Sequence, residues 1–227
     1  MRTIVVIGGS KGIGSAIIQK ELMNNNVINI SRSKPEFKHP NLTHYSCDIL
    51  KEELPELNSV DVLIYCPGSI NLKPFTRLKI EDFKIDYEIN FLGAVIAIQK
   101  YLPLLKESSS PAVLLFSSVA AKIGMPFHAS IASAKSAIEG LVKSLAAEFS
   151  PAIRVNAIAP TITETSLAEK LLRNERMKAQ MVERHPLKKY LKPEEVAELS
   201  SFLISEKAAS MSGQIFEMDC GITTIKT

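Results

Sequence analysis

Three closely spaced glycines near the start of the chain could bind a phosphate group. Gly8, Gly12 and Gly14 lie in the segment Gly8-Gly9-Ser10-Lys11-Gly12-Ile13-Gly14, between a short apolar run and a longer helical pattern. Glycine permits the positive φ angles of a tight turn and the close approach of a ligand. The free N–H groups and the positive dipole end of the helix that follows would hold an anion there. The segment predicts a pyrophosphate-binding turn, and an ordinary glycine-rich turn is the alternative.

The end of the next apolar run carries residues that select the nucleotide. An acidic side chain at this position would bond the ribose 2′-hydroxyl of NAD, but this chain has Ser31-Arg32-Ser33. A guanidinium pairs well with a phosphate dianion, and Lys11 adds a second positive charge from the glycine-rich segment. These residues predict NADP(H) as the cofactor. The alternative is that Arg32 and Lys11 are solvated surface charges.

The elements that would position these residues alternate between short strands and longer helices. Thr3–Ile7 is β-branched and continuously apolar, as a strand buried on both faces should be. Six further strands are predicted at Val27–Ser31, His44–Cys47, Asp61–Cys66, Val113–Ser117, Arg154–Ile158 and Gln214–Met218. Helices are predicted over Ile13–Met23, Ile80–Leu105, Ala129–Phe149, Ser166–Arg184 and Pro193–Ile204. Such alternation predicts an α/β fold, a Rossmann-type doubly wound parallel sheet of about seven strands. The segments between 31 and 61 leave room for little or no helix, so one face of the sheet should be thinly covered.

Composition places these elements in one globular domain spanning residues 1–227. The chain has 46% hydrophobic and 22% charged residues, and 27 Lys and Arg against 24 Asp and Glu give a net charge of +3. That charge is too small to predict a nucleic-acid or membrane partner. Cys47, Cys66 and Cys220 form no CxxC pair, so no metal site is expected, and their odd number fits a reducing cytoplasm. The run Ile4 to Ile7 is too short for a signal peptide, and no apolar stretch approaches the roughly 20 residues of a membrane span.

Along almost its whole length the sequence resembles the short-chain dehydrogenase/reductase family. Its G-x-x-x-G-x-G turn is matched, Asp48-Ile49 resembles the pair that contacts adenine, and Gly68 alone remains of the N-N-A-G motif. Further matches are Asn90, Ser118, the segment Arg154–Pro160, Thr165, Ser212-Gly213-Gln214 and, with one substitution, Asp219-Cys220-Gly221. Thr161 stands where the family has glycine. The resemblance implies a cofactor site formed by Gly8, Ser10, Lys11, Gly12, Ile13, Gly14, Ser31, Arg32, Asp48, Ile49, Gly68, Asn90, Lys135, Pro160, Ile162 and Thr165.

The family's catalytic tyrosine is absent. By resemblance, a Y-x-x-x-K pair supplies a tyrosine that exchanges a proton and a lysine that contacts the nicotinamide ribose, while a serine polarises the carbonyl. The lysine corresponds to Lys135 and the serine to Ser118, but the tyrosine position is Ile131. None of the five tyrosines is followed four residues later by lysine. Asn90, Ser118 and Lys135 remain as candidate catalytic residues.

His128 is the candidate replacement for the proton donor. It lies three residues before Ile131 and seven before Lys135, so the three share one helical face if the helix begins early. Imidazole has an unperturbed pKa near 6.5. A loop histidine that shapes the pocket or bonds backbone is the alternative. Ser130 and Ser133 are poor acids, expected to point away from the Lys135 face, and a water held by Asn90 and Lys135 is a third candidate.

The function predicted from these features is hydride transfer between NADP(H) and a small carbonyl or alcohol substrate. A catalytically silent NADP(H)-binding sensor or partner protein is the alternative, and a lyase or isomerase is third. The charged region Thr161–Leu191 is interpreted as a solvated helix pair, and binding of an anionic substrate is the less favoured alternative. The segment Met125-Pro126-Phe127 is interpreted as pocket wall or as core packing. The resemblance implies a homodimer or homotetramer built on the helices Ile80–Leu105 and Ala129–Phe149. The latter offers the small residues Ala132, Ser136, Gly140, Ser144 and Ala147 for close helix approach, or equally for internal packing.

Overall fold

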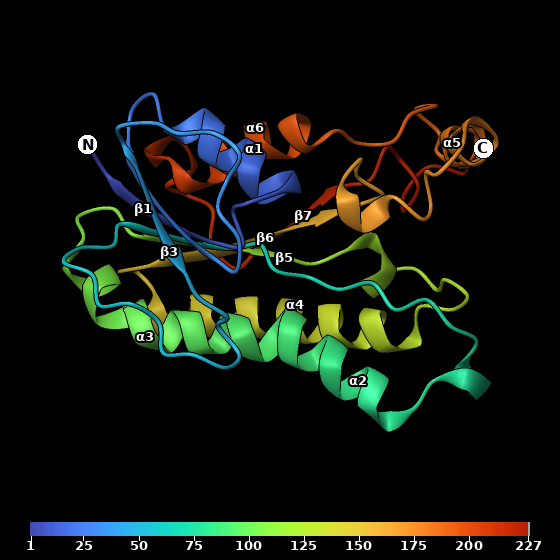
Figure 1. Ribbon diagram of the computed structural model, residues 1–227, viewed down its shortest axis with the longest axis horizontal. Coiled ribbons are helices and arrows are strands. Elements are labelled where there is room, and N and C mark those ends of the chain that lie inside the picture. The colour runs from blue at the N-terminus through green and yellow to red at the C-terminus, as the bar shows by residue number, and fades with distance from the viewer. Residues whose placement is uncertain (227) are drawn as a thin grey trace.

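Seven short strands form one sheet in which every strand runs parallel to its neighbours. The computed structural model describes residues 1–226, and the strand order is β3-β2-β1-β4-β5-β6-β7 (Figure 1). The strands are β1 (Thr3–Ile7), β2 (Asn26–Ser31), β3 (Leu42–Ser46), β4 (Val62–Tyr65), β5 (Ala112–Phe116), β6 (Arg154–Pro160) and β7 (Ile215–Met218). The order reverses direction at β1, which is the switch point where open α/β sheets bind ligands. The predicted doubly wound, Rossmann-type sheet is confirmed.

Helices cover both faces of the sheet. On one face lie α1 (Gly12–Glu21) and α6 (Pro193–Ile204), and on the other lie α2 (Ile80–Tyr87), α3 (Gly93–Glu107) and α4 (Ala129–Phe149) (Figure 1). The remaining helix, α5 (Glu175–Arg184), lies near the C-terminus of the chain, away from the N-terminus (Figure 1). The predicted bounds of α4 and α6 agree with the structure residue for residue. Helix α6 begins with a proline and has two acidic residues in its first turn, which are usual features of a helix N-terminus.

Two of the predicted helices are interrupted in the structure. The predicted helix Ser166–Arg184 consists of a 3₁₀ turn at Ser166–Ala168 and the separate helix α5. The Asn174 side chain accepts a bond from the Met177 N–H at 2.9 Å and starts α5 anew. The predicted helix Ile80–Leu105 contains one π-helical turn, Glu88–Leu92, between α2 and α3.

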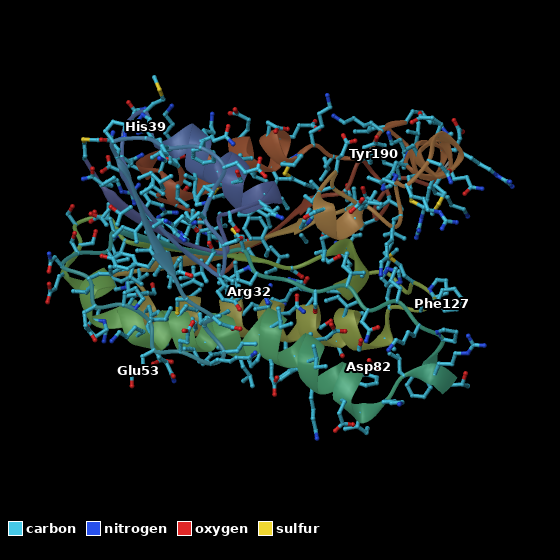
Figure 2. The ribbon with its side chains drawn as sticks, viewed as in Figure 1. Arg32, His39, Glu53, Asp82, Phe127 and Tyr190 are labelled. Atoms are coloured by element: carbon cyan, nitrogen blue, oxygen red, sulfur yellow. The ribbon has the colours of Figure 1, made fainter. Side chains whose placement is uncertain are left out.

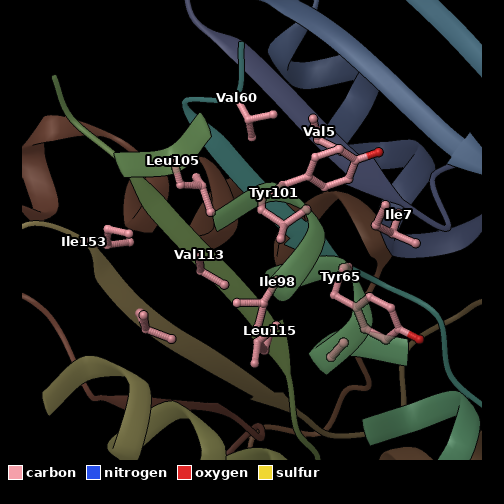
Figure 3. Close-up of a cluster of buried hydrophobic side chains, with 14 of the residues drawn as sticks. Val5, Ile7, Val60, Tyr65, Ile98, Tyr101, Leu105, Val113, Leu115 and Ile153 are labelled. Carbon is pink, nitrogen blue, oxygen red and sulfur yellow. The ribbon is translucent and has the colours of Figure 1, made fainter. Parts of the chain in front are cut away.

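Residues 32–61 contain strand β3 and no helix, as the short crossovers predicted. The loop after β3 instead contributes Leu54 and Val60 to the apolar layer beneath the sheet. That layer is a continuous cluster in which Tyr65, Tyr101 and Leu115 pack between the sheet and α3 (Figure 3). A second buried cluster packs α1 and α6 against the opposite face. Both faces of β1, β4 and β5 are therefore buried, which explains their unbroken apolar sequences.

One helical stretch in residues 1–226 is long and apolar enough to cross a membrane, judged by length and composition only. It is Ile80–Glu107, with 28 residues and a mean hydropathy of 1.2 in its best window, of which 39% is buried inside the fold. The sequence prediction had excluded any apolar stretch of this length. This helix forms part of the layer against the sheet, and core helices of globular proteins meet the same criterion, so the finding is weak evidence for a membrane segment.

Candidate functional site

The glycine-rich turn opens onto a cavity of about 500 Å³ at the carboxyl end of β1 and β2. Gly8 and Gly12 adopt φ angles of +78° and +56°, where L-residues are strained. A Cβ atom on Gly14 would lie 2.6 Å from the Gly8 carbonyl oxygen, so only glycine fits there. The cavity is lined by twelve of the predicted cofactor residues, namely Gly8, Ser10, Lys11, Gly12, Ile13, Gly14, Ser31, Arg32, Asp48, Ile49, Gly68 and Thr165.

The start of α1 has the properties of an anion site. Its N-cap residue, Lys11, makes no side-chain capping bond, and no acidic residue lies in the first turn. The first N–H groups of the helix thus have no side-chain acceptor in the cap, and the positive end of the helix dipole faces the cavity formed by the turn. These residues fit the pyrophosphate of a dinucleotide.

Polar groups surround the place where β2 ends. The Ser33 hydroxyl donates to Ser10 Oγ at 3.1 Å and so joins the end of β2 to the glycine-rich turn. Ser31 Oγ donates to the Ser33 carbonyl oxygen at 3.0 Å. Arg32 and Lys11 are both exposed and both line the cavity, and Arg32 lies between the two helical layers in the view of Figure 2. Two cations and two hydroxyls at this end suit a further phosphate.

A second cavity of about 240 Å³ adjoins the first and shares with it Ile13, Cys66, Gly68, Thr165 and Leu167. It is lined by all four predicted catalytic residues and by two further predicted cofactor residues, namely Asn90, Ser118, His128, Lys135, Pro160 and Ile162. The structure thus brings together, in two adjoining cavities, every site residue predicted from the sequence.

Lys135 is held inside the wall of the second cavity. Only 8% of the residue is exposed, and Nζ donates to the Phe116 carbonyl oxygen at 2.8 Å. Burial lowers the Lys135 pKa to about 8, although the nearby Cys66 and Asp86 favour the charged form. The amine can therefore change its charge close to neutral pH.

Asn90 lies in the π-helical turn, and this turn shapes the wall beside Lys135. The extra residue in the turn leaves the Ile89 carbonyl oxygen without its usual helical partner, and the Tyr65 hydroxyl donates to it at 2.6 Å. Asn90 Nδ2 donates to the Asp86 carbonyl oxygen and to Ser69 Oγ, both at 2.8 Å. A Cβ atom on Gly68 would lie 3.3 Å from Asn90 Oδ1, so the loop after β4 needs a small residue there.

Ser118 and His128 both line the cavity and both bond to backbone. Ser118 caps a short 3₁₀ turn by accepting a bond from the Ala120 N–H at 3.2 Å, which leaves its hydroxyl hydrogen able to donate. His128 Nδ1 lies 2.7 Å from the Pro126 carbonyl oxygen. Since a carbonyl only accepts, Nδ1 carries hydrogen, and Nε2 is the nitrogen left for a ligand. A position in the pocket wall and a bond to backbone are the features of the alternative role for His128, and its role as proton donor stays a prediction.

An apolar side chain occupies the position that the family resemblance assigns to the tyrosine. Ile131 is 5% exposed and lines the second cavity together with Ser118 and Lys135. Met125 also lines this cavity, whereas Phe127 is 55% exposed, with a φ of +71°, and belongs to neither the cavity wall nor the core. Phe127 lies at the end of the molecule away from the N-terminus (Figure 2).

Two buried polar groups at the site escaped the sequence analysis. His185, 1% exposed, lines the second cavity, and its Nδ1 donates to the Met181 carbonyl oxygen at 2.6 Å. Its Nε2 lies 2.7 Å from Thr161 Oγ1 and forms a hydrogen bond with that hydroxyl. Asp86, also 1% exposed, accepts a bond from Ser130, which is buried against α2 rather than merely turned away from Lys135. The sequence could have pointed to Asp86, because its carboxylate lies one helical turn before Asn90. No sequence pattern pointed to His185.

Known proteins are similar to this chain over nearly its whole length. A family model described as enoyl-(acyl carrier protein) reductase matches residues 47–223. A tropinone reductase homolog of Arabidopsis thaliana is 32% identical over 98% of this chain and 91% of its own length. A short-chain dehydrogenase family protein from Francisella tularensis superposes with a TM-score of 0.89 at 27% identity, covering 99% of this chain and 100% of that one. The protein ElxO, solved with NADP bound, superposes with a TM-score of 0.88 at 26% identity, covering 99% of each chain.

Proposed function

This chain belongs to the short-chain dehydrogenase/reductase family, and on that premise we propose that it is an NADP(H)-dependent oxidoreductase. It would transfer a hydride between the cofactor and a small carbonyl or alcohol substrate. The observation that carries the proposal is the pair of adjoining cavities. The first fits a dinucleotide, and the second holds Asn90, Ser118 and Lys135 around an apolar space for a substrate. When bound, the cofactor supplies the hydride chemistry, and the chain supplies position and polarity.

Arg32 and Lys11 support NADP(H) as the cofactor, and so does the NADP bound to the related protein ElxO. A charged hydrogen bond contributes roughly 1.5–3 kcal/mol. Arg32→Asp should therefore weaken NADPH binding about 10- to 100-fold in calorimetric titrations and leave NADH binding within about threefold. Lys34→Asp is the control, because Lys34 carries the same charge two residues later and does not line the cavity. Equal losses for NADPH and NADH in Arg32→Asp would refute the assignment.

Turnover is tested directly with purified protein. NADPH absorbance is followed with a panel of ketones, aldehydes and quinones, and NADP⁺ reduction with the matching alcohols. Lys135→Ala should abolish turnover, because it removes the buried amine from the wall of the second cavity. Tight NADPH binding without turnover of any compound would contradict the oxidoreductase and support the second function.

The second candidate function is a silent NADP(H)-binding sensor or partner protein. One observation favours it: Ile131 places a buried side chain that cannot exchange a proton in the wall of the second cavity. The oxidoreductase is preferred because Asn90, Ser118 and Lys135 still face the same cavity. A positioned general acid contributes typically 10²–10⁴-fold, so its loss slows a reaction that positioning still supports.

Assembly through α2, α3 and α4 is part of the proposal. The small residues predicted for helix approach lie mostly on the outer surface of α4 rather than inside the subunit, and Ser136, Gly140, Ser144 and Ala147 are exposed. The adjoining helices expose Ile85, Leu92 and Ile96. An apolar, small-residue surface of this kind suits a homodimer or homotetramer. Cys47, Cys66 and Cys220 carry free thiols, which supports a cytoplasmic location.

A further inference from the structure

A buried carboxylate and two hydroxyls form a cluster beside the second cavity. Asp86 on α2 and Ser130 in the first turn of α4 are each 1% exposed, and Ser69 follows the loop glycine Gly68. Ser69 Oγ donates to Asp86 Oδ1 at 2.5 Å, and Ser130 Oγ donates to Asp86 Oδ2. A buried charge needs such partners, because an isolated carboxylate in an apolar interior costs several kcal/mol.

The direction of these hydrogen bonds is fixed by their neighbours. The backbone carbonyl of Asp86 can only accept, so the atom of Asn90 that faces it is the amide nitrogen. The same nitrogen donates to Ser69 Oγ, and the Ser69 hydroxyl must therefore direct its own hydrogen elsewhere, to Asp86 Oδ1. Asp86 Oδ1 thus accepts the Ser69 proton, and Ser69 keeps one lone pair for another donor.

Ser69 is the point at which this cluster reaches the cavity. Ser69 lines the second cavity together with Ser118, Ile131 and Lys135, whereas Asp86 and Ser130 lie behind it. A hydroxyl on a ligand in that cavity can donate to the free lone pair of Ser69. Ser69 and Asp86 then form a continuous path from the cavity to a buried base.

The cluster also places a negative charge near Lys135. Lys135 Nζ bonds the Phe116 carbonyl oxygen, and no ion pair joins it to Asp86 within residues 1–226. The two groups are nevertheless close enough for Asp86 to favour the charged amine. Charges in a poorly solvated interior interact over longer distances than charges in water. Asp86 therefore stabilises the positive charge of Lys135 without forming a salt bridge with it.

From this geometry we infer that Ser69 and Asp86 form a proton relay that performs, in the proposed oxidoreductase, the step that Ile131 cannot. In alcohol oxidation the substrate C–H bond breaks and its hydride passes to bound NADP⁺, the oxidant. The alcohol O–H bond breaks as well, and its proton passes to Ser69 Oγ while the Ser69 proton passes to Asp86 Oδ1. The electron pair left on the alcohol oxygen forms the carbonyl π bond, and Asp86 becomes a carboxylic acid. Carbonyl reduction is the reverse.

In this scheme Ser69 touches the substrate and Asp86 acts through it. Ser69 alone is a poor acid and base, because the pKa of an aliphatic hydroxyl is far from neutrality, and the carboxylate behind it removes that difficulty. Ser130 holds the second oxygen of Asp86 and orients the carboxylate. His128 is the competing group, since its Nε2 also faces a ligand in the same cavity, and the experiment separates the two.

The kinetic experiment compares isosteric variants on cyclohexanol, 2-butanol and 1-phenylethanol with NADP⁺. Asp86→Asn keeps the shape of the side chain and one acceptor oxygen but removes the base. It should lower kcat about 100-fold or more, leave KM for the alcohol within about threefold, and raise the solvent deuterium isotope effect on kcat, because proton transfer becomes limiting. Ser69→Ala should behave alike, and Ser69→Thr, which keeps the hydroxyl, should recover most of kcat.

Glu81→Gln is the matched control, since it neutralises an exposed carboxylate on the same helix α2. It should leave kcat and KM unchanged. Full kcat in Asp86→Asn, together with its loss in His128→Gln, would overturn the relay and assign the proton transfer to His128. A purely structural role for Asp86 would likewise show an unchanged isotope effect.

A second measurement needs neither cofactor nor turnover. The pKa of Lys135 is followed by competitive acetylation with acetic anhydride over a pH series, read by mass spectrometry. In Asp86→Asn the Lys135 pKa should fall by about half a unit or more, because the offsetting charge is gone. Cys66, the other group near Lys135, is present in both proteins and does not affect the difference. An unchanged Lys135 pKa overturns the relay. If the wild-type protein oxidises none of the alcohols, the proposed function fails, and this measurement alone judges the relay.

Discussion

At the scale of single residues, Ile131 is the side chain that most restricts proton chemistry in the second cavity. Ile131 occupies a buried position in the cavity wall, four residues before Lys135, and it preserves the packing of α4. Its hydrocarbon side chain can neither donate nor accept a proton. The polar groups that remain around the cavity must therefore handle any proton that moves with the hydride.

Restoring the phenol should reveal how much of the site is intact. Ile131→Tyr places a titratable hydroxyl in the cavity beside Lys135 and Ser118, and it should raise NADPH turnover on the carbonyl panel about 10²- to 10⁴-fold, as a positioned general acid does. Ile131→Phe is the control, because it adds the ring without the hydroxyl. Equal rates for the two variants would show that the surrounding groups no longer fit a proton donor at position 131.

The buried amine of Lys135 gives stability a dependence on pH. Its pKa is about 8 in the folded protein and about 10.5 when exposed, so the folded chain binds fewer protons than the unfolded chain between those values. Unfolding free energy should therefore rise with pH from about 8 to 10.5, by up to about 3 kcal/mol relative to Lys135→Met. Urea unfolding at several pH values measures this difference.

Lys51→Met, which removes an exposed amine, is the control for that series and should run parallel to the wild type. If Lys135→Met runs parallel as well, Lys135 is not the buried cation that the structure shows. The sign also matters: a relative loss of stability as pH rises would contradict burial as the cause of the lowered pKa.

At the scale of elements, the sequence predicted the sheet but could not predict the π-helical turn of Glu88–Leu92. Strands such as β1 are continuous β-branched runs, and such a run is typical of a strand that is buried on both faces of a sheet. The π-helical turn depends on a tertiary contact, the hydroxyl of Tyr65 on the Ile89 carbonyl oxygen, which no local pattern encodes. The break before α5 could have been found, because Asn174 is a good N-cap residue within a charged stretch.

Gly93 should be essential to this turn. A Cβ atom there would lie 2.0 Å from Tyr65 Oη and 3.0 Å from Tyr65 Cζ, closer than packed atoms can approach. Gly93→Ala should therefore destabilise the protein by about 1–3 kcal/mol in urea unfolding, the usual cost of overpacking. Tyr65→Phe removes the closer atom and should recover part of that loss in the double variant. Strict additivity of the two changes would rule out the steric explanation.

At the scale of the whole molecule, sequence reasoning found the residues of the site but not all of its connections. The glycine-rich turn and Arg32 were identified because they follow the first two strands, at the carboxyl ends where a parallel sheet binds its ligand. Lys135 was identified by the resemblance to the family's Y-x-x-x-K motif. Asp86 and Ser69 are 17 residues apart and meet only through the packing of α2 against the loop after β4. A pairing of this kind follows from the tertiary fold, so the chain order alone could not reveal it.

The outer surface of α4 determines whether two copies of the chain can pack together. Gly140 is exposed, and a Cβ atom there would meet nothing within 4 Å, so a second helix could approach closely at this point. Gly140→Glu puts a charge and a long side chain into that approach without disturbing the subunit, and it should convert the assembly to a monomer of 25.0 kDa in light scattering. Gly124→Glu is the matched control, because Gly124 has equally open surroundings but lies in the loop before α4, and it should keep the wild-type mass. Retention of the full assembly by Gly140→Glu would place the interface elsewhere, and a monomeric wild-type protein would contradict the proposed assembly altogether.

Monomer formation in the Gly140 variant alone would instead locate the contact on α4, beside the segments that carry Asp86 and Asn90. Activity measurements on the same variant would then show whether the second cavity depends on a neighbouring subunit.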